Sequence, residues 1–145
     1  MAVPSLRLLP FLPIQQQTFL AFDFGLRRTG VASGNVLTRT ATPQPTVVLP
    51  ANAKAEARLL AVAQRITDWQ PDALVVGVPF HPDGAPHDNT LRAQKFARQL
   101  RARFGLPVFE VDERYSTTEA LAGGAKDADA ASACIILEQF LRSLP

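Results

Sequence analysis

The sequence is poor in cysteine, with Cys134 as the one thiol in 145 residues. It therefore has no disulfide framework and no cysteine-rich zinc site, and a lone thiol fits a reducing cytoplasm. No apolar run approaches the roughly 20 residues of a membrane span, so we expect no membrane partner. The positive excess is small, a formal +2 from 15 Lys and Arg against 13 Asp and Glu. Such a charge is compatible with a nucleic-acid partner without requiring one.

Histidine is also sparse. His81 and His87 both lie in a loop rich in proline and glycine, residues 79–88, together with two aspartates. Their spacing matches no standard set of metal ligands, so a solvated loop is favoured over a metal site. Because the loop follows a predicted buried strand, contact with a substrate is the functional alternative.

Prolines interrupt the first 17 residues at Pro4, Pro10 and Pro13, and no clear small-residue cleavage site follows. This pattern predicts a flexible N-terminal extension over residues 1–17 and argues against a signal peptide. Residues 18–145 have the length of one domain.

The stretch 18–30 is the most informative part of the chain. An apolar run ends in a carboxylate, Asp23, and is followed by Gly25, Arg27 and Arg28. The run predicts a buried strand with Asp23 at its exposed end. Burying a carboxylate is costly unless a cation or hydrogen bonds compensate, and a glycine leaves room for a ligand or another backbone. We interpret the stretch as a carboxylate directed at a cation or a phosphate, with two arginines beside it.

Strands and helices alternate along the rest of the chain. Short links predict that the first three strands form an antiparallel meander, and helical links predict parallel strands after them. The order predicts an α/β protein with the ribonuclease H-like arrangement: a five-stranded mixed sheet, its first strand beside the fourth, with helices on both faces. The expected strands are the run ending at Asp23, 29–34, 46–49, 73–78 and 108–111, and the main helices are 53–69, 89–104 and 127–144.

Two of these helices carry finer predictions. In the helix 53–69, Trp69 shares a face with the apolar residues and is interpreted as a core anchor, with Asn52 as a possible N-cap. The helix 89–104 contains arginine and lysine but no acidic residue. A solvated face and a phosphate-attracting surface both stay open for it. The pattern Ser116–Glu119 fits a capping box, which favours a structural role for Glu119.

Carboxylates far apart in the sequence are expected at one end of the sheet. Asp23 ends the first strand, Glu113 follows the fifth, and Asp129 opens the last helix. Carboxylates without histidine or cysteine suit Mg²⁺ or Mn²⁺, and such ions activate water and stabilise the leaving oxygen of a phosphodiester. Gly25 is expected on the substrate side, with the arginines 27, 28 and 114 (Arg27, Arg28, Arg114) as phosphate contacts. The chemistry indicated is metal-dependent hydrolysis of phosphodiester bonds.

Five blocks of sequence carry a resemblance to a known family. They are DFGLRRTGVA (23–32), VVGVPFHPDG (75–84), KFARQLRARFGLPV (95–108), DERYSTTEA (112–120) and DAASACIILEQFL (129–141). In this order they resemble the YqgF family, the Holliday-junction-resolvase-like nucleases linked to processing of pre-16S ribosomal RNA.

The resemblance implies a cytoplasmic protein with a ribonuclease H-like fold and an acidic site at Asp23, Glu113 and Asp129. Asp112 is a weaker candidate, because it faces away from Glu113 on an extended strand. In related resolvases the second acid lies on the fourth strand, where this chain has Gly77. The segment 121–128 is shorter than is common in the family, which leaves substrate choice and dimer contacts open.

Several functions stay open on the sequence. The leading one is a metal-dependent endonuclease acting on structured RNA, namely precursor 16S ribosomal RNA, as a monomer or a homodimer. The same site would serve a resolvase of branched, four-way DNA junctions. A nucleic-acid-binding factor without catalysis gains nothing from clustered carboxylates. An actin-like ATPase needs two such domains, and the chain has the length of one.

Overall fold

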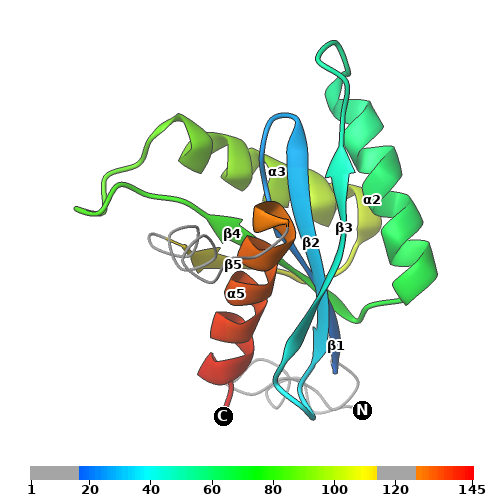
Figure 1. Ribbon diagram of the computed structural model, residues 1–145, viewed down its shortest axis with the longest axis vertical. Helices are drawn as coiled ribbons and strands as arrows, with labels where there is room; N and C mark the ends of the chain where they lie inside the picture. Colours follow the sequence, from blue (N-terminus) through cyan, green and yellow to red (C-terminus); the bar gives the residue numbers. More distant parts are fainter. Residues whose placement is uncertain (1–16, 114–126) are drawn as a thin grey trace.

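The computed structural model describes residues 17–113 and 127–145. They form a five-stranded sheet in the order β3-β2-β1-β4-β5 (Figure 1). Arg114, the Ser116–Glu119 pattern, the segment 121–126 and residues 1–16 lie outside the described part. The strands are β1 (Thr18–Asp23), β2 (Arg28–Asn35), β3 (Ala41–Val48), β4 (Ala73–Val78) and β5 (Val108–Asp112).

The predicted topology is confirmed. β1 is central: it pairs antiparallel with β2 and parallel with β4. β3 pairs antiparallel with β2, and β5 pairs parallel with β4. A short link suffices between antiparallel neighbours, whereas each parallel pair is joined through a helix. The carboxyl ends of β1, β4 and β5 therefore lie at the same end of the sheet.

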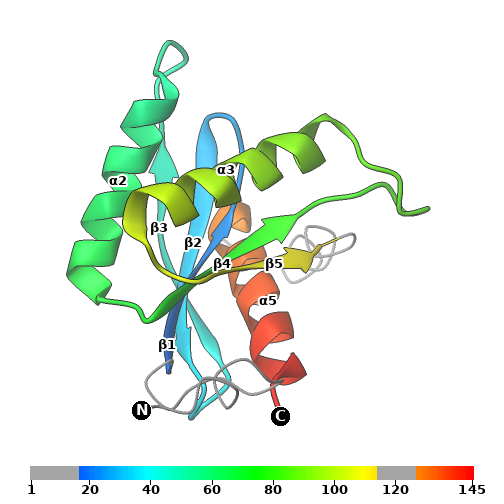
Figure 2. The same ribbon diagram turned by 180° about the vertical axis from the view of Figure 1, so that it is seen from behind.

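Helices cover both faces, as predicted. α2 (Ala55–Trp69) and α3 (Asp88–Phe104) lie on one face, and α5 (Ala128–Ser143) lies on the other (Figures 1 and 2). Among the described residues, none of the helices has both the length and the apolar character that crossing a bilayer requires.

The alternation of side chains along β1 divides the interior into two cores. Leu20 and Phe22 pack towards α2 and α3, whereas Phe19 and Ala21 pack towards α5. This follows from the two-residue period of a strand. By the same alternation Asp23 belongs to the α5 face, although the four residues before it are all apolar.

For the helix 53–69 the predicted end at Trp69 is confirmed, whereas the predicted start and N-cap and the core role of Trp69 were wrong. The helix begins at Ala55, and its N-cap is Lys54, not Asn52; Lys54 makes no side-chain cap. Trp69 is 47% exposed and is not a core anchor. It shares a helical face with Ile66, but it lies in the last turn, where its ring borders a hollow of about 390 Å³ together with Thr18 and Pro71.

β3 is longer than the predicted strand 46–49, because it begins at Ala41 and includes Pro43 and Pro45. A proline removes a hydrogen-bond donor, so it is tolerated at the edge of a sheet and excluded from its centre. β3 is such an edge strand. The prolines correctly predicted that this segment is not a helix, but they led us to miss the first five residues of the strand.

Candidate active site

Asp23 lies where β1 ends, between two glycines on the neighbouring strands. Its register partners are Gly30 on β2 and Gly77 on β4. A strand side chain with glycine on either side has space around it, and here that space faces the first turns of α5. Asp23 is half-buried as a result.

Both glycines are needed because other groups come close. A Cβ on Gly30 would stand 1.9 Å from the carbonyl oxygen of Asp129, so the backbone of α5 packs directly on β2. A Cβ on Gly77 would stand 2.8 Å from Oε2 of Glu113 and 2.3 Å from Cδ1 of Ile136. Gly30 thus fixes the start of α5 over the sheet, and Gly77 makes room for the Glu113 carboxylate.

Glu113 is the acid that comes from the end of β5. It is 7% exposed, and its backbone N–H donates to the carbonyl oxygen of Val78 at 3.2 Å. The neighbouring Asp112 is exposed. The expectation that Asp112 faces away from Glu113 agrees with this placement.

Asp23 and Glu113 meet directly. Burial raises the pKa of Asp23 from 3.8 to about 6, a hydrogen bond with the Glu113 side chain opposes the rise, the negative charge of Asp129 adds to it, and a hydrogen bond with Ser132 opposes it. A hydrogen bond between two carboxyl groups requires a proton on one of them. A proton shared between Asp23 and Glu113 therefore reduces the negative charge of these two carboxyl groups.

The two aspartates at the start of α5 have different tasks. Asp127 is the N-cap, and its Oδ1 accepts from the backbone N–H groups of Asp129 and Ala130 at 3.0 and 3.2 Å. Its other oxygen accepts from the Thr46 hydroxyl at 2.7 Å. Burial raises the pKa of Asp127, but these hydrogen bonds and Arg28 outweigh it and lower the pKa overall. The side chain of Asp129 does not cap the helix and instead extends towards Arg28 on β2.

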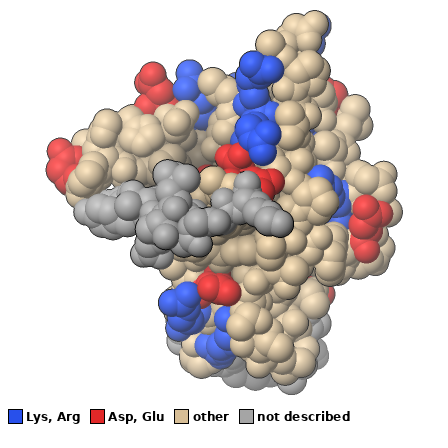
Figure 3. Space-filling view, viewed as in Figure 1, with Lys and Arg blue, Asp and Glu red and all other residues tan. Residues whose placement is uncertain are grey.

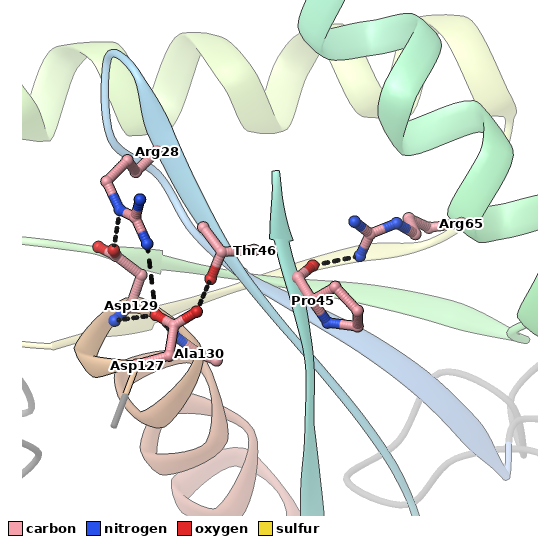
Figure 4. A network of polar contacts seen from close by, with 7 residues as sticks. All are labelled: Arg28, Pro45, Thr46, Arg65, Asp127, Asp129 and Ala130. Atoms are coloured by element: carbon pink, nitrogen blue, oxygen red, sulfur yellow. Dashed lines mark hydrogen bonds and ion pairs between the residues drawn. The ribbon is translucent and has the colours of Figure 1, made fainter. Parts of the chain in front are cut away.

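Arg28 receives the side chain of Asp129. Its Nε lies 2.6 Å from Oδ2 of Asp129, and its Nη2 lies 3.7 Å from Oδ1 of Asp127 (Figure 4). Figure 3 shows basic and acidic side chains meeting at the surface over this end of the sheet. Arg28 was predicted as a phosphate contact, and in this structure its guanidinium is paired with a candidate metal ligand.

Arg27 and Gly25 occupy the turn between β1 and β2. Arg27 is exposed, and within the described residues its side chain makes no hydrogen bond or ion pair. A Cβ on Gly25 would stand 2.3 Å from the carbonyl oxygen of Arg28, so the glycine is required by close backbone approach within the turn. Arg27 is thus exposed on a turn that Gly25 shapes, and its contact with a phosphate stays a prediction.

Arg58 of α2 holds this turn from the other face of the sheet. It is 7% exposed and donates to the carbonyl oxygens of Gly25 and Leu26 and to the hydroxyl of Thr29. Its guanidinium carbon lies 4.5 Å from the centre of the Phe24 ring. Burial lowers the pKa of Arg58, and its Nε and Nη2 donate to three neutral oxygens without a carboxylate.

The donor set fits a hard divalent cation in chemistry and in charge. Asp23, Glu113 and Asp129 offer only oxygen ligands. The pKa of Asp23 is raised chiefly by burial, and the negative charge of Asp129 adds to the rise. Within residues 17–113 and 127–145, no three side chains of His, Cys, Asp or Glu are gathered as a ready-made metal site. The ion pair of Asp129 with Arg28 is the feature that separates it from the other two acids.

The basic helix α3 is partly neutralised. Arg101 pairs with Glu110 at 3.0 Å, and Arg103 pairs with Glu56 at 2.6 Å. Lys95 and Arg98 are exposed, and no ion pair holds them within the described residues. The solvated-face interpretation holds for the C-terminal part of the helix, and the phosphate interpretation stays a prediction for the rest.

The histidine loop is organised by α3. The rings of His81 and His87 lie 4.7 Å apart, and His87 is the N-cap of α3, with Nδ1 accepting from the N–H of Asn89 at 3.1 Å. His87 therefore has a capping task that the spacing of the two histidines did not reveal.

Three contributors to the site were missed by the sequence reasoning. Arg58, Ser132 and Asp127 each lie within a predicted helix, and none of them was predicted as a site residue. The spacing of Ser132 and Asp129 by three residues places both on one helical face, which was the available signal. The buried arginine on an otherwise apolar helical face was the signal for Arg58.

Comparisons with known proteins find relatives that match nearly the whole chain. A family model described as "RuvX: Holliday junction resolvase" matches residues 17–143. A protein of Polaromonas sp. named "Putative pre-16S rRNA nuclease" is 77% identical over 141 residues, covering 97% of this chain and 99% of its own. A protein of Albidiferax ferrireducens with the same name is 69% identical, covering 88% and 80% of the two chains.

Solved structures show the same fold at low identity. RuvC of Thermus thermophilus in complex with a Holliday junction substrate has a TM-score of 0.52 at 18% identity, covering 88% of this chain and 94% of that one. A second structure of that RuvC has a TM-score of 0.51 at 16% identity, covering 87% and 95%. At this identity the likeness concerns the fold alone.

Proposed function

The chain belongs to the RuvX family, and from that membership we propose that it is a metal-dependent nuclease that cleaves precursor 16S ribosomal RNA. The observation that carries the proposal is the meeting of Asp23 and Glu113 beside the start of α5, where the charge of Asp129 adds to the cost of ionising Asp23. Clustered carboxylates with a raised pKa at the end of a sheet are a functional arrangement, because a purely structural site would avoid their mutual repulsion.

Asp23, Glu113 and Asp129 are the residues that would hold Mg²⁺ or Mn²⁺. When bound, such an ion supplies Lewis-acid stabilisation of phosphate oxygens and an activated water. Without it, Asp23 and Glu113 share a hydrogen bond that needs a proton. These two carboxyl groups must lose that proton before both can act as anionic ligands.

Three further residues would position the substrate and the ligand Asp23: Arg27, Arg58 and Ser132. Arg27 extends from the β1–β2 turn into solvent, where it can pair with a phosphate. Arg58 donates to the carbonyl oxygens of Gly25 and Leu26 and so fixes the backbone of the turn that carries Arg27. Ser132 hydrogen-bonds Asp23 and directs its carboxylate.

RNA is favoured as substrate by the names of the relatives at 69–77% identity. A ribosomal RNA substrate places the protein in the cytoplasm, and its assembly as a monomer or a homodimer stays a prediction. The description of the family model favours a second candidate substrate, the four-way DNA junction. Both substrates present the same phosphodiester to the three acids.

The test is side-by-side cleavage of an end-labelled 16S precursor RNA and a four-way DNA junction, each with Mg²⁺, with Mn²⁺ and with EDTA. We expect cleavage of the RNA at a defined position, none in EDTA, and loss of cleavage in Asp23→Asn. Asp112→Asn is the matched control, because Asp112 is exposed and adjacent to Glu113. Preferential cleavage of the junction would establish the second candidate, and full activity in EDTA would contradict the metal. Retained function of Asp23→Asn in cells would indicate a binding factor without catalysis.

A further inference from the structure

Arg28 joins β2 to the first turn of α5 by a contact that differs from the other arginine contacts of the site. Its Nε lies 2.6 Å from Oδ2 of Asp129, and within the described residues it is the one cation paired with that carboxylate. The side chains of Arg28 and Asp129 are 50% and 35% exposed. Both side chains are therefore partly accessible to solvent.

The backbone beneath this pair is fixed. Gly30 packs so closely on the carbonyl group of Asp129 that a Cβ there would overlap it. Asp127 caps α5 and is held by Thr46 from β3. We therefore expect any change at Asp129 to be a rotation of its side chain about a fixed helix end. Figure 4 shows the Asp127 cap and the Thr46 contact that hold this end.

Charge explains why Asp129 turns to Arg28. Asp23, Glu113 and Asp129 are all carboxylates, and like charges repel, so moving Asp129 towards the other two is unfavourable unless a cation lies between them. The Arg28 guanidinium, 2.6 Å from Asp129, supplies a positive charge at hydrogen-bonding distance. The pairing of Asp129 with Arg28 therefore offsets part of the negative charge of the three carboxylates.

We propose that Arg28 is a displaceable counter-cation for Asp129, which competes with the catalytic metal and sets the affinity of the site for it. This rests on the proposed function. Asp129 would exchange Arg28 for the metal by a side-chain rotation, and the guanidinium of Arg28 would then be free to pair with a substrate phosphate. Arg28 is a positioning residue in the free protein and a substrate contact only after the exchange.

The alternative is a purely structural ion pair. Exposed ion pairs contribute little to stability, and the start of α5 is already fixed by its Asp127 cap and by the packing on Gly30. A structural role predicts that removing Arg28 lowers the melting temperature and leaves metal affinity unchanged. A counter-cation role predicts that removing Arg28 leaves the melting temperature unchanged and increases the affinity for the metal. The two interpretations can therefore be separated in one set of variants.

The experiment is titration of the metal-free protein with Mn²⁺, followed by calorimetry and by the electron paramagnetic resonance of free Mn²⁺, without nucleic acid. We expect Arg28→Gln to bind Mn²⁺ tighter than wild type by roughly 5- to 10-fold, within the usual range of coupling between two binding events. Arg28→Lys keeps the charge and should lie between them. Arg27→Gln is the matched control. It removes the same charge from the neighbouring arginine, which has no ion pair in the described part. The affinity of this variant for Mn²⁺ should stay within about twofold of wild type.

Each outcome decides something. No Mn²⁺ binding by wild type overturns the metal-dependent function and this inference together. Binding that Asp23→Asn abolishes, with equal or weaker affinity in Arg28→Gln, overturns the inference alone. Equal tightening in Arg27→Gln and Arg28→Gln also overturns it, because the effect would then be general electrostatics. Melting temperatures of all variants show whether a change in affinity comes from misfolding.

Discussion

Gly77 and Glu113 lie so close together that a Cβ on the glycine would stand 2.8 Å from Oε2 of the glutamate. The two residues come from neighbouring strands: Gly77 is the next-to-last residue of β4, and Glu113 follows β5 directly. A carboxylate that approaches Asp23 from β5 must pass over β4, and only a residue without a side chain lets it pass. The acid from the end of β5 thus uses the space that a β4 side chain would otherwise fill.

Gly77→Ala should therefore disturb the site and the core at once. The new methyl group would meet Glu113 and also Cδ1 of Ile136 at 2.3 Å. We expect a loss of stability of about 1–3 kcal/mol from overpacking and a fall in cleavage rate of roughly 10- to 100-fold from the displaced ligand. Urea unfolding and the cleavage assay measure the two effects.

Gly105→Ala is the control for that variant. Gly105 caps α3 at φ +66°, and nothing lies within 4 Å of a Cβ there. The substitution should cost about 1 kcal/mol through backbone strain and leave cleavage unchanged. Equal loss of cleavage in both glycine variants would indicate a general effect of stability.

The raised pKa of Asp23 gives the metal-free protein a pH-dependent stability. The folded protein holds the proton of Asp23 up to about pH 6, against an ordinary pKa of 3.8. The resulting stabilisation is present below the ordinary value and is lost as pH rises through about 6. Asp23→Asn cannot ionise, so its stability relative to wild type should increase between pH 4 and pH 7 by up to roughly 3 kcal/mol.

Urea unfolding in EDTA at several pH values tests this sign. A constant difference between Asp23→Asn and wild type would contradict it. With metal present the same titration should appear in catalysis as a rise in rate through the neighbourhood of pH 6, because the ionised form is the ligand.

The two-residue period of the strands explains most of what the sequence could predict. It also explains the pairing of Arg28 with Asp129, which the sequence analysis missed. The alternation that separates Phe19 from Leu20 also places Asp23 on the face of α5. Continued along β2, it assigns Arg28 to the α5 face with Gly30 and assigns Thr29 to the α2 face, where Arg58 binds it. Treating Arg27 and Arg28 as one basic pair concealed this difference.

Other features depend on where the core ends, which periodicity does not specify. Trp69 has the correct helical spacing, yet it lies in a turn that extends to the rim of the sheet. β3 contains prolines, and only its position at the edge makes them acceptable. Sheet order was predictable because chain connections restrict it, whereas the reach of each element depends on packing between distant segments.

Arg58→Met should loosen the β1–β2 turn. The variant leaves the carbonyl groups of Gly25 and Leu26 and the hydroxyl of Thr29 without their donor. We expect a loss of about 2–4 kcal/mol, since several polar groups lose a buried charged partner. Amide hydrogen exchange of the turn residues should become faster, and affinity for RNA should fall as Arg27 loses its fixed position.

Arg65→Met is the control on the same helix. Arg65 donates to the carbonyl oxygen of Pro45 at 2.5 Å at an exposed position. Its loss should change stability by less than about 1 kcal/mol and leave exchange in the β1–β2 turn as in wild type. Faster exchange in both variants would show that α2 as a whole, and not the Arg58 contact, holds the turn.

Asp127 and Asp129 allow capping and catalysis to be separated at one helix end. Asp127→Ala removes the N-cap of α5 and the contact to Thr46, so it should cost about 0.5–2 kcal/mol while Asp23, Glu113 and Asp129 keep their carboxylates. Asp129→Ala removes a proposed ligand but no cap, so it should lower the cleavage rate by roughly 100-fold or more with little change in melting temperature. Asp127→Ala should thus lower the stability, and Asp129→Ala should lower the cleavage rate. A loss of cleavage in Asp127→Ala that persists well below its melting temperature, with Asp129→Ala still active, would exchange the roles of the two aspartates and place the metal ligand at the cap.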